Sequence, residues 1–385
     1  TVIVAHRNPW RMAVAAPLAA RLREDSRMPL VLFDGEDAPT LSTTNLAALG
    51  ASRLILIGNA TIDAAPHSED ATHAVPHHFA VEAHIDADTP TACGLAVSKR
   101  FWPHAATLVA APVADPKALL MSSALAARLA APCIPTASTA PDPRLLAEAR
   151  RLNAQSIYLV LPAHPPAPIG RWRTAARRNG WKGRISPVRP DEVPALLAAL
   201  GKPDSIRNLV VTRVPEDADR LPPETAWLAP YISALHGSPV LTLDSPDALV
   251  CEQAVEAYVR KQLLSPRSVT ILGDYEAIGV ITIDRSAGLG EYTVEVEPCA
   301  LPHTGFAASY GVGRIPQHSL AEAALFIARG VVKAEDLKDR RPAVTLIANA
   351  EQEYGPLPLC ETVARVTENE LKNCRLKVKS FYSTP

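Results

Sequence analysis

Five histidines crowded into one stretch are the residues in this sequence best suited to hold a metal ion. They fall within 18 residues, and the carboxylates of Asp70, Glu82 and Asp86 lie among or just beyond them. Neutral imidazoles at such spacing bind zinc, copper or nickel. The spacing fits no standard zinc pattern, and a solvated loop leading into an edge strand fits equally well. The histidines are His67, His73, His77, His78 and His84, of which the last three are the predicted ligands.

Acidic residues offer a second ion site. Asp274 and Glu276 follow the apolar run Val269–Leu272, and Asp284 comes shortly after them. If that run is a parallel strand, its carboxyl end is where open α/β sheets bind ligands. Asp274 and Glu276 would then bind calcium or a polar ligand, although a plain acidic loop is the favoured interpretation. The sequence therefore predicts no cofactor, with calcium or a transition metal as the alternative.

The six cysteines form no Cys-x-x-Cys pair, which argues against a structural zinc site and against a dense disulfide framework. Cys299 lies four residues before His303, a spacing that resembles a nucleophile and its base. Such partners usually meet through the fold rather than through sequence proximity, so we expect a structural role for Cys299. We predict free buried thiols at Cys93, Cys133, Cys251, Cys299, Cys360 and Cys374.

The segment 171–184, RWRTAARRNGWKGR, is locally basic and contains two tryptophans. We interpret it as a solvated helix face on which arginine stems cover apolar surface. The formal net charge of the whole chain is -1, which argues against a nucleic-acid or anionic-membrane partner. No apolar run reaches the ~18 residues that a membrane span needs.

The most distinctive motif is YGVGRIPQHSLAEAALFIARG, at residues 310–330. Gly313 permits a sharp strand end, and Pro316 removes a backbone donor beyond it. Ser319 and Glu322 have the spacing of a capping box at a helix start. The Arg314 guanidinium would then donate paired hydrogen bonds to a carboxylate or to loop carbonyls. We predict an architectural clamp here rather than a substrate contact.

Asp274 and Glu276 are the acidic groups expected to meet Arg314, since they follow a strand that precedes the motif. Gly313, Arg314, Pro316 and Asp274 together form the predicted structural motif.

Helix-like and strand-like segments alternate along the chain, and one phrase occurs three times. The copies begin MAVAAPLAARL, ALLMSSALAARL and, more weakly, AWLAPYISALHG. From Pro29 to Pro132, and again from Gly50 to Asn153, the offset is 103 residues. Short runs rich in Val, Ile and Leu between the helices are typical of parallel strands. Leu22 and Leu129 should therefore occupy equivalent buried positions.

These patterns predict an α/β fold with three duplicated Rossmann-like or flavodoxin-like parallel-sheet units. A chain of 385 residues is too long for one compact core. Hydrophobic residues make up 48% and charged residues 21%, which is ordinary for a globular protein. The predicted domains are residues 1–100, 101–203 and 204–385.

The order of Ala-rich helix, PLVL strand, amphipathic helix and LGASRLILIG strand resembles the cell-wall-binding repeat found in tandem on bacterial surface proteins. The resemblance covers residues 10–60, 115–165 and 225–275. It implies a non-catalytic module that binds anionic wall polymers. It also implies a secreted or cell-surface location, with a cytoplasmic location as the alternative.

The third copy also resembles the first half of the catalytic domain of gingipain-type cysteine peptidases, relatives of caspases. The resemblance covers residues 205–385 and rests on Gly273–Asp274, Val312–Pro316, Ser319, Glu322 and Ala323. It implies a protein or peptide substrate. It also implies, as partner, a C-terminal catalytic portion of the same polypeptide or its cleaved fragment.

The catalytic pair of that family has no counterpart in the sequence. The family uses a His in a Gly-His-Gly context and a downstream Cys. After Glu351 this chain has 34 residues, with Cys360 and Cys374 but no histidine. No catalytic residue is therefore assigned. Two functions stay open: the N-terminal part of a gingipain-like cysteine peptidase, or a non-catalytic tandem α/β binding module of a cell-surface protein.

Overall fold

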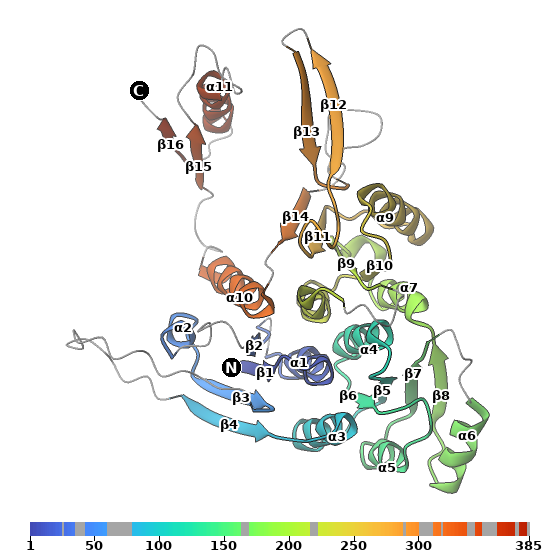
Figure 1. The fold of residues 1–385 in the computed structure, drawn as a ribbon. Coiled ribbons are helices and arrows are strands. Elements are labelled where there is room, and N and C mark those ends of the chain that lie inside the picture. The colour runs from blue at the N-terminus through green and yellow to red at the C-terminus, as the bar shows by residue number, and fades with distance from the viewer. Residues whose placement is uncertain are drawn as a thin grey trace, which may run out of the picture. The chain divides into compact units, whose positions relative to one another are not determined.

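The structure is a computed structural model of the chain (Figure 1). It divides into two compact parts, Thr1–Ala328 and Arg329–Pro385. The division falls inside the range 204–385 that the sequence assigns to one domain. The structure describes residues 1–24, 27–34, 43–59, 79–162, 169–215, 222–287, 290–299, 311–316, 319–336, 343–348, 360–373 and 377–382.

The first part contains three four-stranded sheets in which all neighbouring strands are parallel. Counted along the chain within each sheet, the strand order is the same in all three: second, first, third, fourth. The predicted α/β fold with three duplicated parallel-sheet units is confirmed. The sheets are β2-β1-β3-β4 (Leu30–Asp34, Val2–His6, Arg53–Ile57, Ala80–Ile85), β6-β5-β7-β8 (Cys133–Thr136, Thr107–Pro112, Ser156–Val160, Arg184–Val188) and β10-β9-β11-β14 (Val240–Leu243, Asn208–Arg213, Ser268–Leu272, Gly311–Ile315).

Burial explains why the inner strands carry continuous apolar runs. In β1, β5 and β9 almost every residue is buried, as expected for parallel strands covered on both faces. The edge strand β4 is mostly exposed, and its exposed residues include Glu82 and His84 as well as the apolar Val81.

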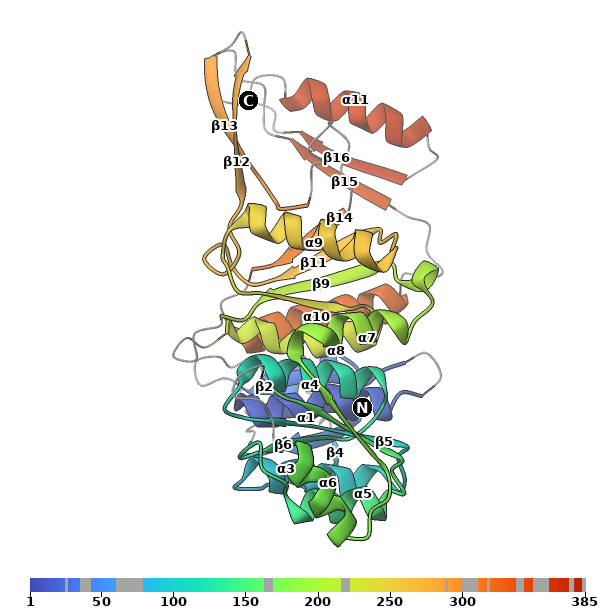
Figure 2. The same cartoon turned by 90° about the vertical axis from the view of Figure 1, so that its right-hand side faces the viewer.

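The first helices of the three copies, α1, α4 and α8, contact one another (Figure 2). Asn8 and Asp115 cap α1 and α4 by accepting hydrogen bonds from backbone N–H groups in the first turn. The stretch Met12–Ala19 of α1 is buried throughout, which is possible because alanine lets neighbouring elements approach closely. The helices are α1 (Pro9–Arg21), α2 (Thr43–Ala48), α3 (Pro90–Phe101), α4 (Pro116–Arg128), α5 (Pro143–Arg151), α6 (Ile169–Arg178), α7 (Val193–Ala199), α8 (Ala229–His236), α9 (Ala248–Gln262), α10 (Leu320–Asp336) and α11 (Cys360–Asn373).

Leu22 and Leu129 do occupy equivalent positions, at the C-caps of α1 and α4. Their N–H groups donate to the carbonyls of Leu18 and Leu125, four residues earlier in each helix. Both are partly exposed, however, whereas the sequence predicted burial. A C-cap lies where the chain leaves the packed helix face, and this explains the partial exposure.

The third copy contains a β-hairpin that is not among the elements predicted from the sequence. Strands β12 (Ile281–Ala287) and β13 (Gly290–Val296) pair antiparallel between β11 and β14. The signal was present in the alternation of Ile-Thr-Ile and of Tyr-Thr-Val-Glu-Val on either side of a glycine-containing turn.

The second part is a βαβ arrangement. Strands β15 (Ala343–Ala348) and β16 (Lys377–Tyr382) are parallel and joined by α11. Across both parts, no helix within the described ranges has the length and apolarity to cross a membrane.

Candidate functional site

Arg314 lies in β14 with a side chain that is only 4% exposed. Its Nε donates to both carboxylate oxygens of Glu297 at 2.9 Å, and its Nη2 donates to one of them at 2.6 Å. The partner carboxylate belongs to the segment after β13, not to Asp274 or Glu276 as the sequence suggested. The two groups form a bidentate, charge-assisted pair.

The other guanidinium hydrogens bond to backbone carbonyls of the loop after β11. Nη1 donates to the carbonyls of Gly273, Asp274 and Ile278 at 3.2, 3.0 and 2.8 Å. Nη2 also donates to the carbonyl of Gly279 at 3.2 Å. All three nitrogens therefore have protein partners, and the guanidinium fastens one loop to the end of the hairpin.

Asp274 contributes to this clamp through its backbone carbonyl, and its side chain holds the loop in shape. Its Oδ1 accepts hydrogen bonds from the N–H groups of Glu276 and Ala277 at 3.1 and 2.7 Å, which fixes the turn. Gly273, with φ of 140°, is in a region closed to other residues. Tyr275 lies beneath the guanidinium, with the ring centroid 4.6 Å from Arg314 Cζ.

The rest of the motif starts α10. The Ser319 hydroxyl accepts from the Glu322 N–H at 3.5 Å, at the long limit of a capping bond. Gly313 and Pro316 are exposed, and a Cβ at Gly313 would meet no atom within 4 Å. Close packing does not require glycine at position 313.

The predicted metal site is only partly within the described chain. His77 and His78, with His67 and His73, lie outside it. His84 is in β4, and its Nε2 is 3.1 Å from the carbonyl oxygen of Gly58. Among the described residues, no group of three or more His, Cys, Asp or Glu side chains is arranged to hold a metal ion.

Two other predicted sites were an ion site at Asp274, Glu276 and Asp284, and a pair formed by Cys299 and His303. The described residues do not form either of them. Asp274 and Glu276 are held in the turn described above. Asp284 lies on β12, and His303 lies outside the described residues. Cys299 is buried and free, as are Cys93, Cys133 and Cys251.

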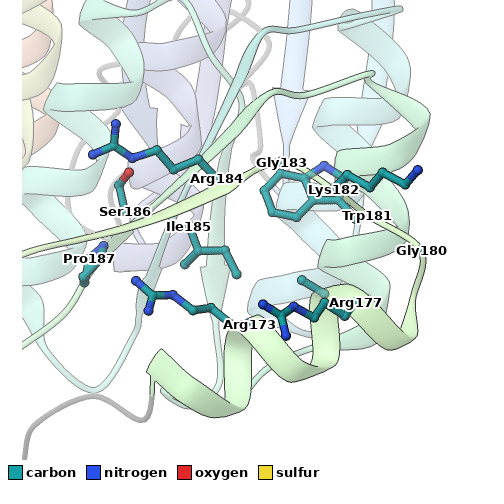
Figure 3. Close-up of a pocket in the computed structure, with 11 residues that line it drawn as sticks. Arg173, Arg177, Gly180, Trp181, Lys182, Gly183, Arg184, Ile185, Ser186 and Pro187 are labelled. Atoms are coloured by element: carbon teal, nitrogen blue, oxygen red, sulfur yellow. The ribbon is translucent and has the colours of Figure 1, made fainter.

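A pocket of about 680 Å³ opens between α6 and β8 in the second sheet. Four basic side chains contribute to its lining, and no acidic side chain does (Figure 3). Arg173 and Arg177 extend from α6 on one side, with Ile185 and Arg184 opposite. Lys182 lies in the connecting turn. The segment 171–184, interpreted above as one helix face, comprises the end of α6, a turn and the first residue of β8.

The pocket has a rigid apolar base. Trp181 is 5% exposed, and its indole N–H donates to the carbonyl of Ala154 at 2.9 Å. A Cβ at Gly183 would lie 2.2 Å from the Trp181 ring, so only glycine fits there. Gly180 ends α6 in the left-handed conformation, with φ of 69°.

The basic groups of the pocket are free to bind a ligand. The side chains of Arg173, Arg177, Lys182 and Arg184 are exposed, and none makes a hydrogen bond or ion pair with another described residue. Uncompensated positive charges around one hollow raise the local potential for anions. Arginine forks match carboxylate and phosphate oxygens in particular.

No protein-family model matches the sequence, and neither does any curated protein sequence. Among solved structures, the chain is similar to Cwp6 from Clostridium difficile, with 14% identity and a TM-score of 0.53 over 98% of this chain and 54% of that one. It is also similar to Cwp8 from Clostridium difficile, with 13% identity and a TM-score of 0.50 over 72% of this chain and 45% of that one. The chain thus spans about half the length of these proteins. At such identities the likeness shows the fold alone, a tandem arrangement of α/β copies.

Proposed function

We propose that this chain is a non-catalytic binding module of a secreted or cell-surface protein, and that it binds an anionic ligand at the α6–β8 pocket. The observation that carries the proposal is the set of four unpaired basic side chains around one hollow that has no acidic lining residue. The chain as a whole is nearly neutral, so this concentration of positive charge is a local feature. An extended polyanion with carboxylate or phosphate groups has the matching chemistry.

Two further observations support the proposal. The structural neighbours Cwp6 and Cwp8 are cell wall proteins, and the tandem copies resemble wall-binding repeats whose members bind anionic polymers. Arg173 and Arg177, one turn apart on α6, project from the same helix face. Two guanidinium groups at this spacing would meet successive anionic groups of a chain-like ligand.

The cysteine-peptidase resemblance stays a separate prediction. The donors of Arg314 are all engaged by Glu297 and loop carbonyls, which favours an architectural role for the motif. We expect the purified chain to hydrolyse no peptide substrate. Hydrolysis that is abolished by Cys360→Ser or Cys374→Ser would instead support the peptidase.

The binding test uses polygalacturonate and long-chain polyphosphate as probes for carboxylate and phosphate polymers. Removing two exposed charge contacts at ~0.2–1 kcal/mol each should weaken binding roughly 2- to 30-fold. Arg173→Gln/Arg177→Gln is the test variant. Arg171→Gln/Arg178→Gln is the matched control, because it removes the same charge from the same helix outside the pocket lining.

Calorimetry at two salt concentrations separates the outcomes. We expect binding that weakens with salt, is roughly 2- to 30-fold weaker in the pocket variant and is unchanged in the control variant. Equal losses in both variants would mean nonspecific attraction to α6. Absence of binding to either polymer by the wild type would reject the pocket as a polyanion site.

A further inference from the structure

Two arginines from different copies lie where the central helices of the three copies end. Arg128 is the last residue of α4 in the second copy, and Arg23 lies two residues after the end of α1 in the first. Helix α8 of the third copy contacts both α1 and α4 (Figure 2). The C-terminal turn of α8 is therefore within reach of both arginines.

That turn brings the two guanidinium groups to one place. Arg23 Nη2 donates to the carbonyl of Leu235 at 3.3 Å. Arg128 lies against Gly237, two residues further on, where a Cβ would be 2.9 Å from Arg128 Nη1. A Cβ at Gly201, in the chain after α7, would be 3.0 Å from Arg128 Nη2. A side chain at either glycine would therefore crowd the guanidinium.

The donors of Arg128 are not engaged by the described part of the chain. Its Nε is buried without a hydrogen-bond partner, and its Nη atoms make no hydrogen bond or ion pair with a described residue. Burial and the positive charge of Arg23 lower the pKa of Arg128 below that of an ordinary arginine. Two like charges are thus held together, and no carboxylate within the described ranges pairs with either of them.

The helix ends explain only part of this arrangement. Carbonyls at a helix C-terminus attract cations, and Arg23 bonds to one of them. An arginine with an architectural role has its donors engaged, as Arg314 does with Glu297 and four loop carbonyls. Arg128 is half-buried, and a buried donor without an acceptor costs free energy. Its guanidinium is therefore available to an acceptor from solution.

We propose that Arg23 and Arg128 form a binding site for one small tetrahedral oxyanion, phosphate or sulfate, at the junction of the three copies. A guanidinium donates paired hydrogen bonds to two oxygens of such an anion. The anion would cancel the repulsion between the two arginines and connect the first two copies beside the end of α8. A compact anion suits a half-buried guanidinium better than a polymer does. The site shares no residue with the α6–β8 pocket and does not depend on it.

Calorimetric titration of the full chain with sodium sulfate or sodium phosphate tests the proposal. The background is Arg173→Gln/Arg177→Gln, which weakens anion binding at the α6–β8 pocket. We expect this background to bind one sulfate or phosphate in a saturable way. Adding Arg128→Gln should weaken binding roughly 10-fold or more, as expected for hydrogen bonds between charged groups.

Two further variants keep the test independent of any effect of Arg128→Gln on folding. Arg23→Gln changes an exposed side chain and should weaken binding by up to about 5-fold. Arg260→Gln removes an exposed charge from α9 and should leave binding unchanged. Absence of saturable binding in the background, or equal affinities in the Arg23, Arg128 and Arg260 variants, would overturn the proposal.

Thermal unfolding gives a second readout. Sulfate stabilises proteins in general because it is excluded from their surface, so the comparison is between variants at equal sulfate concentration. The background should gain more in melting temperature than the chain that also carries Arg128→Gln, because a ligand of the folded state stabilises it. Arg128→Lys should fall between them. Equal gains in all three would refute the site.

Long-chain polyphosphate distinguishes a single anion from a polymer. Its phosphate groups are nearly all internal, so we expect it to bind the background no better than orthophosphate does per phosphate group. Polyphosphate binding that Arg128→Gln abolishes, in a chain that binds neither orthophosphate nor sulfate, would assign the two arginines to a polymer and overturn the proposal.

Discussion

Replacing Arg314 by alanine is the sharpest test of how the third sheet is held together. The substitution removes a guanidinium that is bonded to Glu297 and to four loop carbonyls. It also removes the contact with the Tyr275 ring. The loop after β11 and the end of the hairpin would lose their common partner, although each keeps its own backbone geometry.

The expected decrease in the free energy of unfolding follows from the burial of the ion pair. Breaking a buried ion pair by removing one partner costs about 3–5 kcal/mol. Glu297 is 26% exposed, so water regains access to its carboxylate and the loss should lie near the lower end, at about 3 kcal/mol. Arg314→Lys should retain only part of the stability that Arg314→Ala loses, because an ammonium group cannot donate the paired, coplanar hydrogen bonds of a guanidinium. Glu297→Gln should cost less than Arg314→Ala, since the carbonyl partners of the arginine remain.

Urea unfolding followed by tryptophan fluorescence measures the effect, since Trp227 is buried within the third copy. Arg260→Ala is the control: this exposed arginine on α9 should change the free energy of unfolding by less than about 0.5 kcal/mol. If Arg314→Ala unfolds at the same urea concentration as the wild type, the clamp is not a stabilising element and the reasoning fails.

Two further predictions concern the second copy. Burial alone would raise the pKa of Glu148, but hydrogen bonds from Arg151 and Ser98 lower it overall. Its stabilising effect is therefore present above about pH 4.3 and fades as pH falls through the lowered value, so Glu148→Gln should differ most from the wild type at pH 7 in urea unfolding. A constant difference down to pH 3 would contradict this. Gly183→Ala should destabilise by about 1–3 kcal/mol because its Cβ meets an indole ring, whereas Gly170→Ala, with open space, should be neutral or mildly stabilising by calorimetry; equal melting temperatures would contradict the steric argument.

The fold could be predicted from the sequence because its signals are local and repeated. Apolar runs such as Val269–Leu272 and Val240–Leu243 are strands in the structure. The 103-residue offset correctly aligns the start of β2 with that of β6, and the start of β3 with that of β7. The hairpin between β11 and β14 was not predicted, because its two short strands alternate apolar and polar residues instead of forming continuous apolar runs. Turn chemistry and short strands give weaker signals than long buried runs do.

The candidate sites were harder to predict from the sequence than the fold, because they depend on contacts between distant segments. Arg314 was expected to bind a carboxylate or loop carbonyls, but its carboxylate partner could not be identified before the hairpin was known, since Glu297 is brought to it by β13. The basic pocket was missed for a related reason. Its arginines on α6 and Arg184 on β8 are close in sequence, yet only the turn at Gly180 makes them face one hollow.

The contact among α1, α4 and α8 limits how the three copies can change over evolution. Ala15 and Ala124 are fully buried where larger side chains would clash with neighbouring elements. Each copy therefore supplies part of the core of the others, so a copy cannot be deleted or exchanged alone without exposing an apolar helix face. The third copy accommodates the hairpin between β11 and β14 without a change in the strand order of its sheet. The copies that look modular in the sequence should therefore fold as one unit.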